Sequence, residues 1–225
     1  MKFGVLRFPG SCDDIDALDA ARRVGDAELL WHGERDLRGS DAIVVPGGFS
    51  YGDYLRAGAI ARFAPAMESV IAHARGGGLV LGICNGFQVL CEARLLPGAL
   101  LPNANRHFTF RQLALDVVQP HTAFTSACEA GMSIPAKHAW GRYYADEPTL
   151  QRMEAGGQVV LRYGAGENFN GSVRDIAGVS NEAGNVFGLM PHPEHAIDEL
   201  TGGSSDGLAI FESMRQPSMT RSRWG

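Results

Sequence analysis

The strongest constraint on the fold lies between residues 78 and 90, where an apolar segment runs into a cysteine flanked by glycines. Residues 79–81 are typical of a strand buried on both faces, and residues 87–93 fit a helix. Cys84 falls between them, in the pattern Gly82-x-Cys84-x-Gly86. Glycines at these positions allow a tight strand-to-helix turn, so the segment predicts a nucleophile elbow that holds Cys84 in a strained, exposed position.

Two properties of such a turn favour chemistry at Cys84. The unpaired N–H groups and the dipole at the start of the following helix favour a thiolate over a thiol. The same N–H groups can hold an oxyanion that develops on a substrate. The alternative is that Cys84 is a small buried hydrophobic residue on a glycine-rich connection, as most free cysteines are. The five-residue pattern alone leaves both interpretations open.

The N-terminal half alternates between strand and helix patterns. Strands are predicted at residues 3–8, 27–31 and 42–46, and helices at residues 13–24 and about 57–75. This alternation predicts an α/β fold with a doubly wound, mainly parallel sheet and helices on both faces. Sites in such sheets lie beyond the carboxyl ends of the strands, where the Gly47-Gly48 loop and Cys84 both fall.

The pattern changes after Pro97. Less regular strands are predicted at residues 109–118, 133–138, 158–163 and 176–179, without a clear helix between the first two, which predicts a small antiparallel excursion. A buried strand at 186–190 and a final helix at 207–214 follow. We expect residues 1–225 to form one domain that ends in a loosely held tail at 216–225.

Composition excludes several classes of function. The 225 residues carry a net charge of −5 without a basic stripe, so no nucleic acid or anionic membrane surface is expected as a partner. No signal-peptide core or membrane-spanning run is present. The four cysteines form no Cys-x-x-Cys pair, which favours reduced thiols in a cytoplasmic protein and argues against a metal site.

A cysteine nucleophile needs a base within hydrogen-bond reach, and the base needs an orienting group. Of the seven histidines, His192 stands out because it follows an apolar strand in the sequence Pro191-His192-Pro193-Glu194. In an extended segment, residues two apart point to the same side, so the His192 ring and the Glu194 carboxylate are expected to meet. The alternative is a surface turn with an ordinary histidine and a solvated acid.

Taken together, Gly-Ile-Cys-Asn-Gly-Phe-Gln at 82–88 and the later Pro-His-Pro-Glu resemble the class I (triad) glutamine amidotransferases. Within them, the chain is similar to the separate glutaminase subunits of purine biosynthesis. The resemblance includes residues 46–56, 58–63, 170–172 and 175–179 and extends over nearly the whole chain. It implies a flavodoxin-like version of the α/β fold.

By this resemblance Cys84 attacks the side-chain amide of L-glutamine, His192 carries the proton to the leaving ammonia, and Glu194 holds and polarises His192. A γ-glutamyl thioester forms and is hydrolysed. The expected substrate contacts, which include the backbone N–H groups that stabilise the oxyanion, are Gly47, Gly48, Phe49, Asn85 and Gln88. For Gln88 the alternative is an ordinary half-buried helix glutamine. No metal is expected on this chain.

One segment departs from the family. His138-Ala139-Trp140-Gly141-Arg142 stands where similar chains carry His-Gly-Glu-Gly, so a side-chain carboxylate near the amino-acid end of glutamine is missing. Backbone contacts are compatible with the change.

Ammonia released here must be used on another chain, because the sequence has no Gly-x-x-x-x-Gly-Lys-Ser/Thr loop for ATP. The resemblance implies a synthetase subunit that binds ATP, Mg²⁺ and formylglycinamide ribonucleotide, and a small bridging subunit. Two alternatives stay open from fold and elbow alone: a cysteine hydrolase or thiol-stress protein, and a scaffold subunit without activity.

Overall fold

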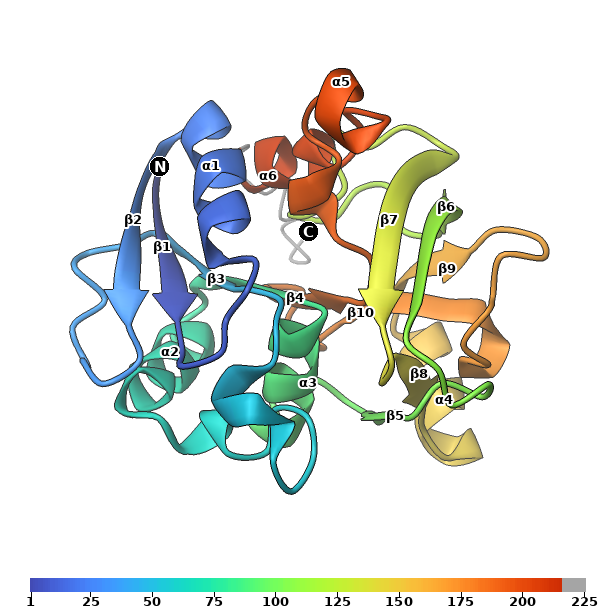
Figure 1. Cartoon of the computed structure of the whole chain (residues 1–225), viewed down its shortest axis with the longest axis horizontal. Coiled ribbons are helices and arrows are strands. Elements are labelled where there is room, and N and C mark those ends of the chain that lie inside the picture. The colour runs from blue at the N-terminus through green and yellow to red at the C-terminus, as the bar shows by residue number, and fades with distance from the viewer. Residues whose placement is uncertain (216–225) are drawn as a thin grey trace, which may run out of the picture.

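The computed structural model describes residues 1–215, so the predicted tail at 216–225 lies outside the described residues. Within them, the chain builds a nine-stranded mixed sheet in the order β2-β1-β3-β4-β11-β10-β9-β6-β7 (Figure 1). A separate antiparallel pair joins β5 and β8, with bounds Ala99–Leu101 and Arg142–Tyr144. None of the described helices has the length and apolar character needed to cross a membrane.

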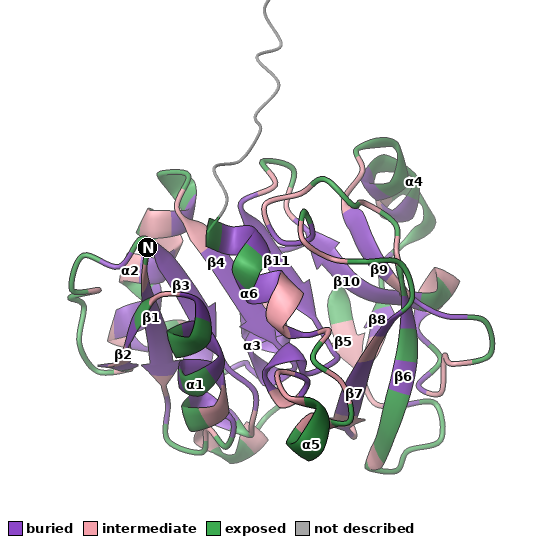
Figure 2. Ribbon diagram, turned by 90° about the horizontal axis from the view of Figure 1, so that it is seen from above, coloured by how far each residue is buried: buried purple, intermediate pink, exposed green. Residues whose placement is uncertain are grey.

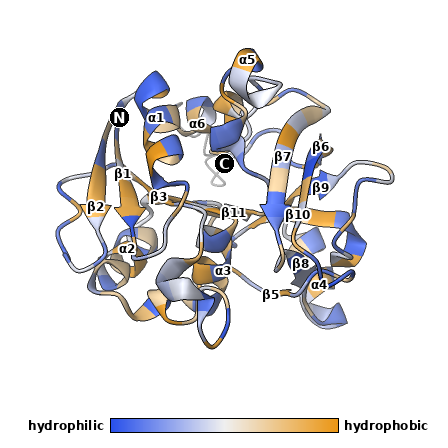
Figure 3. Cartoon of the chain, in the orientation of Figure 1, coloured by the Kyte–Doolittle hydropathy of each residue, from blue (hydrophilic) through white to orange (hydrophobic). Residues whose placement is uncertain are grey.

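The first five strands of the sheet are parallel to one another, as predicted. They are β2, β1, β3, β4 and β11, with bounds Asp26–Trp31, Lys2–Arg7, Ala42–Val45, Leu79–Ile83 and Val186–Leu189. Every residue of β3 and β11 is buried, which explains their continuous apolar sequence. Figures 2 and 3 show this part of the sheet as the buried, apolar centre of the molecule.

Helices cover both faces of the parallel part. On one face α1 (Asp14–Val24) packs against α6 (Leu208–Arg215), and on the other lie α2 (Pro65–Arg75) and α3 (Asn85–Glu92) (Figure 1). In α1 the apolar residues fall on one buried side, while Arg22 and Arg23 end the helix near its negative dipole end. The doubly wound arrangement is therefore confirmed.

The predicted antiparallel excursion is also confirmed, and it extends the same sheet. Its strands β10, β9, β6 and β7 have the bounds Ile176–Ser180, Val159–Tyr163, Thr109–Val117 and Met132–His138. The pairing of β6 with β7 runs from Thr109 opposite His138 to Leu115 opposite Met132. Through this pairing β7 brings Lys137 and His138 to the site described below.

Two helix predictions need correction. The helix expected from about residue 57 begins only at Pro65, because proline takes the first helical position and keeps Ala64 extended. Residues 61–63 before it form a short 3-10 turn. Helix α4 (Glu147–Ala155) was not predicted, although its start carries a clear signal: the Asp146 side chain accepts a hydrogen bond from the Thr149 N–H. The remaining short helix, α5, covers Glu199–Gly202.

Candidate active site

The predicted elbow is present between β4 and α3. Cys84 caps the start of α3 with a φ of 50° and a ψ of −103°, a strained combination for a residue with a side chain. The flanking glycines are required by contact: a Cβ on Gly86 would lie 1.8 Å from the Val45 carbonyl oxygen, and one on Gly82 would lie 2.9 Å from the backbone of Gly86. The strain and the close packing together fix the direction of the Cys84 side chain.

The Cys84 side chain is buried, and the predicted exposed position is wrong. It lines a pocket of about 160 Å³, open to solvent beside the exposed Phe49 and Phe108, together with Gly48, Gln88, Trp140 and His192. A pocket of this size suits a small substrate. The sulfur lies 3.9 Å from the Lys137 carbonyl oxygen.

His192 reaches the same cavity from the neighbouring strand. Strands β4 and β11 are parallel and in register, with Ile83 opposite Leu189, and the Cys84 N–H donates to the Leu189 carbonyl at 2.8 Å. Their carboxyl ends therefore lie side by side, and the residues that follow each strand meet. The His192 backbone is held by its own N–H, which donates to the Pro135 carbonyl at 2.7 Å.

The predicted contact between His192 and Glu194 is confirmed, with 2.6 Å between Nδ1 and Oε1. The local conformation differs from the extended segment that was expected, because Pro193–His195 form a 3-10 turn. Both side chains are buried. Since Nδ1 faces the carboxylate, the other ring nitrogen, Nε2, is left for the cavity, and it has no hydrogen-bond partner among the described residues. An imidazole oriented in this way can accept a proton at Nε2.

Charge at the site favours the imidazolium form of His192. Burial lowers the pKa of the ring, but the negative charges of Glu194 and of the Cys84 thiolate outweigh it and raise the pKa to about 10. The ring therefore readily takes the proton that a thiol gives up.

The Gly47-Gly48-Phe49 loop follows β3 and lies beside the elbow, as expected from the sheet topology. Gly47 packs directly against the His192 ring: a Cβ at position 47 would be 2.8 Å from Cε1 of His192. Gly48 adopts a φ of 132°, and its N–H makes no backbone hydrogen bond among the described residues. The Phe49 N–H instead donates to the Gly10 carbonyl at 2.8 Å. Of the loop donors expected for the oxyanion, only Gly48 is therefore free in this structure.

Asn85 and Gln88 follow Cys84 in α3, and both are buried. The Asn85 side chain accepts from the Ser50 N–H at 3.0 Å and donates to Gln88 Oε1 at 2.8 Å, which ties the glycine loop to the elbow. Gln88 also donates to the Trp140 carbonyl at 2.5 Å and lines the cavity. The Asn85 backbone N–H, in the first turn of the helix, has no intrahelical acceptor and is a second donor for an oxyanion.

The segment that departs from the family forms one wall of the cavity. His138, Ala139 and Trp140 line it, and the carbonyl of Trp140 holds Gln88. His138 is buried, stacks on Phe169, and contacts Asn103 Oδ1 through Nδ1 at 3.0 Å. Burial and the nearby His192 charge lower the pKa of His138 to about 3, so its ring is neutral.

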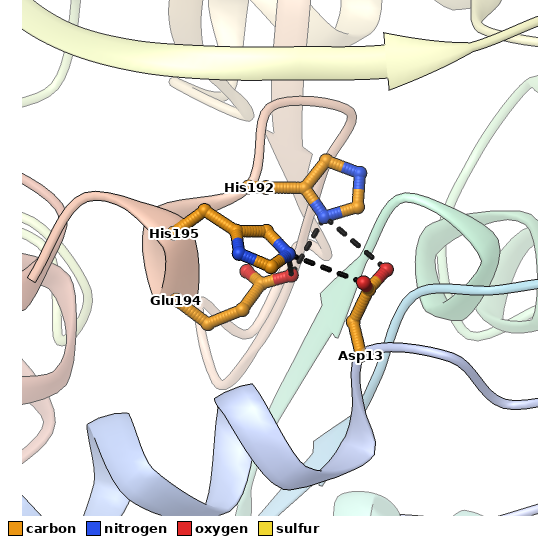
Figure 4. A group of neighbouring side chains, drawn as sticks. All are labelled: Asp13, His192, Glu194 and His195. Carbon is orange, nitrogen blue, oxygen red and sulfur yellow. Dashed lines mark hydrogen bonds and ion pairs between the residues drawn. The ribbon is translucent and has the colours of Figure 1, made fainter. Parts of the chain in front are cut away.

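Sequence reasoning missed three polar residues at the site, Asp13, Lys137 and His195. Asp13 lies 3.6 Å from Nδ1 of His192, and its carboxylate also contacts Lys137 at 2.6 Å and His195 at 3.1 Å. Figure 4 shows this carboxylate, at the start of α1, pointing toward both imidazoles. The sequence places Asp13 only at the start of the helix predicted at 13–24, and nothing local in the sequence relates it to residues 137, 192 and 195.

Four of these side chains also have the composition of a metal site. The donor atoms of Asp13, His192, Glu194 and His195 lie within 4.8 Å of one another. In this structure, however, the His195 imidazole and the Lys137 ammonium both hydrogen-bond to Oδ1 of the Asp13 carboxylate. A cation would have to compete with that ammonium group.

The fold and the Cys84, His192 and Glu194 arrangement are those of a triad amidotransferase. Residues 1–216 match the family described as CobB/CobQ-like glutamine amidotransferase domain, and the chain belongs to this family. It is 59% identical over 216 residues to the phosphoribosylformylglycinamidine synthase subunit PurQ of Mycolicibacterium paratuberculosis, covering 95% of this chain and 96% of that one. Identity to PurQ of Mycobacterium tuberculosis is 58%, covering 94% and 95%.

Solved structures agree with this assignment. The structure of PurLQS from Thermotoga maritima contains a chain with 42% identity and a TM-score of 0.86, with coverage of 95% of this chain and 96% of that chain. A glutamine amidotransferase from the same organism, at 16% identity and a TM-score of 0.56, shares the fold; 96% of this chain and 90% of that chain are covered.

Proposed function

We propose that this chain is the glutaminase subunit of a phosphoribosylformylglycinamidine synthase, in the biosynthesis of purines (IMP). It hydrolyses L-glutamine and passes the ammonia to a synthetase subunit, which converts formylglycinamide ribonucleotide to formylglycinamidine ribonucleotide with ATP. The observation that carries this proposal is the meeting of Cys84 with the His192–Glu194 pair at one small cavity. The near full-length similarity to PurQ subunits supports the particular reaction.

The first half of the reaction forms a thioester. The thiol proton of Cys84 moves to Nε2 of His192, and the sulfur attacks the side-chain amide carbon of glutamine. The N–H groups of Gly48 and Asn85 hold the resulting oxyanion. His192 then gives its proton to the amide nitrogen, the C–N bond breaks, and ammonia leaves. Throughout, Glu194 accepts the Nδ1 hydrogen and stabilises the imidazolium.

The second half releases glutamate. Nε2 of His192 takes a proton from water, and the hydroxide attacks the thioester carbon. The C–S bond breaks, and the sulfur recovers its proton from the imidazolium. Covalent catalysis therefore divides one slow amide hydrolysis into two faster steps.

Gly47, Gly48, Phe49, Asn85 and Gln88 are proposed as substrate contacts. Gly48 and Asn85 act through backbone N–H groups, and Gln88 acts through its amide in the cavity. Gly47 supports the His192 ring from below. The Phe49 side chain lines the cavity, while its N–H is engaged with Gly10.

The nitrogen acceptor is expected on partner chains. A complex named PurLQS contains the similar chain from Thermotoga maritima, so we propose a PurL-type synthetase and a small PurS-type bridging subunit as partners. ATP and Mg²⁺ would bind to the synthetase, and no cofactor is proposed on this chain. We further propose that the described residues act as one amidotransferase domain in the cytoplasm, an assignment supported by four cysteines that are all free.

Reconstitution tests this function. The chain is mixed with the candidate synthetase and bridging subunit, and formation of formylglycinamidine ribonucleotide is measured with glutamine or with ammonium as nitrogen donor. We expect Cys84→Ala to abolish glutamine use and to leave ammonium use intact. Cys91→Ala, a matched control in the same helix, should retain both. Glutamine use that persists in Cys84→Ala would contradict the proposal.

A further inference from the structure

Asp13 stands at the start of α1 but does not cap the helix. Its backbone takes the cap position with a φ of −109° and a ψ of 17°, and its side chain accepts no hydrogen bond from the first-turn N–H groups. Aspartates at the starts of two other helices behave in the usual way, since Asp146 and Asp198 both accept such bonds. A buried aspartate that gives up this stabilising contact must gain its partners elsewhere.

The partners of the Asp13 carboxylate are His192 and two residues close to it. One carboxylate oxygen, Oδ1, contacts Lys137 Nζ at 2.6 Å and His195 Nε2 at 3.1 Å. The other oxygen, Oδ2, lies 3.6 Å from Nδ1 of His192, the nitrogen that also contacts Glu194. Burial raises the pKa of Asp13, but its bond to His195 and the charges of His192 and Lys137 hold that pKa well below its usual range. Asp13 is therefore an anion beside His192.

We propose that Asp13 is a positioning residue, a second carboxylate that holds the His192 ring and stabilises its imidazolium form alongside Glu194. Lys137 and His195 fix the direction of the carboxylate. Gly47 is required for the arrangement, because a Cβ there would lie 2.5 Å from Asp13 Oδ2 and 2.8 Å from the His192 ring. Glu194 and Asp13 thus both face Nδ1 of the ring, which leaves Nε2 for the pocket. This inference rests on the proposed function.

The sequence neighbour Asp14 separates this role from simple helix stabilisation. Asp14 is also buried and also lies in the first turn of α1, but its carboxylate pairs with Arg7 at the end of β1. Loss of the negative charge at either position removes a similar favourable interaction with the helix dipole. Only Asp13 contacts His192, so only its loss should change the titration of that ring.

Several charged or titratable groups lie around His192. They come from the helix start, the elbow, strand β7 and the 3-10 turn: Asp13, Cys84, Lys137, His138, Glu194 and His195. The negative groups favour the imidazolium, while the ammonium of Lys137 and a proton on either other histidine disfavour it. Removing Asp13 and removing Lys137 should therefore shift the His192 pKa in opposite directions.

The test is an NMR titration of the ¹⁵N-labelled His192 ring in the full chain. A Cys84→Ala background is used so that the ring titrates without the coupled thiol. We expect Asp13→Asn to lower the His192 pKa by about one to three units and Lys137→Met to raise it. Asp14→Asn should leave it unchanged. If Asp13→Asn does not fold, Asp13→Ser, which also removes the charge and suits a helix start, is titrated in its place.

Turnover with Cys84 intact gives a second readout. In the complex with synthetase, Asp13→Asn should lower kcat for glutamine about 10-fold, with KM nearly unchanged, and shift the basic limb of the pH profile to lower pH. An unchanged His192 pKa in Asp13→Asn, or a lowered one in Lys137→Met, would overturn the inference. If the wild-type chain released no ammonia, the proposed function would fail, while the NMR titration would still decide the role of Asp13.

Discussion

Replacing Glu194 by glutamine separates the charge of this residue from its shape. Glutamine keeps the chain length and an oxygen that can accept the Nδ1 hydrogen of His192, but it carries no charge. In the structure the two groups are buried and 2.6 Å apart. Together with Cys84, Glu194 raises the His192 pKa from 6.5 to about 10 in spite of burial. This pKa increase corresponds to a free energy of about 5 kcal/mol that favours the imidazolium form over the neutral ring.

Of the two charges, Glu194 has the larger effect on His192. Loss of one partner from a buried ion pair costs about 3 kcal/mol. The imidazolium forms in both transition states, so Glu194→Gln should lower kcat for glutamine hydrolysis about 100-fold. Ammonia release is measured in the assembled complex, with Glu182→Gln, an exposed change, as the control. A Glu194→Gln enzyme with near wild-type kcat would refute this electrostatic role.

The same pair makes a prediction about stability. The His192 pKa is raised in the folded chain, so its contribution to the free energy of unfolding is complete below pH 6.5 and is lost as the pH rises to about 10. In Glu194→Gln most of this dependence should disappear. Thermal unfolding of both proteins across that pH interval measures it. Parallel curves for wild type and variant would show that Glu194 does not couple to His192.

Three further predictions follow from other parts of the structure. Gly86→Ala places a Cβ 1.8 Å from the Val45 carbonyl oxygen and should destabilise the fold by about 3 kcal/mol. The control Gly76→Ala, whose Cβ would meet nothing closer than 3.4 Å, should be nearly neutral. Thermal unfolding measures both variants. The His138 pKa is lowered to about 3 in the folded chain, so His138→Gln should make the loss of stability between pH 6.5 and 3 shallower in acid titrations; an unchanged slope would contradict this. The isolated chain should hydrolyse glutamine poorly and speed up on assembly, because the synthetase that would consume the ammonia is expected on another chain; a full rate without partners would contradict this.

The sequence predicts the parallel half of the fold well because its signals are local. The strand patterns at β1, β3, β4 and β11 are continuous apolar runs, and the elbow lies between a strand and a helix that are adjacent in sequence. The pairing of His192 with Glu194 is local too, with one residue between them. The backbone of this segment was nevertheless predicted wrongly, because a 3-10 turn and not an extended segment brings His192 and Glu194 together.

Contacts between distant segments could not be predicted in this way. Asp13 meets Lys137 and His195 only because α1 begins, β7 ends and the turn after β11 lies at the same end of the sheet. Nor could the sequence show that the Phe49 N–H donates to Gly10, or that the Cys84 thiol is buried. These features depend on how loops pack over the sheet, and no periodicity within one segment reports that packing.

The most direct measurement is the capture of the covalent intermediate. The complex is quenched with acid during turnover of radiolabelled glutamine, digested and analysed by mass spectrometry. We predict a γ-glutamyl group on the peptide that contains Cys84. This group should be absent from the Cys84→Ala variant, and that variant should release no ammonia. Ammonia release by Cys84→Ala at the wild-type rate, with no label on Cys84 in the wild type, would contradict thioester chemistry at this cysteine.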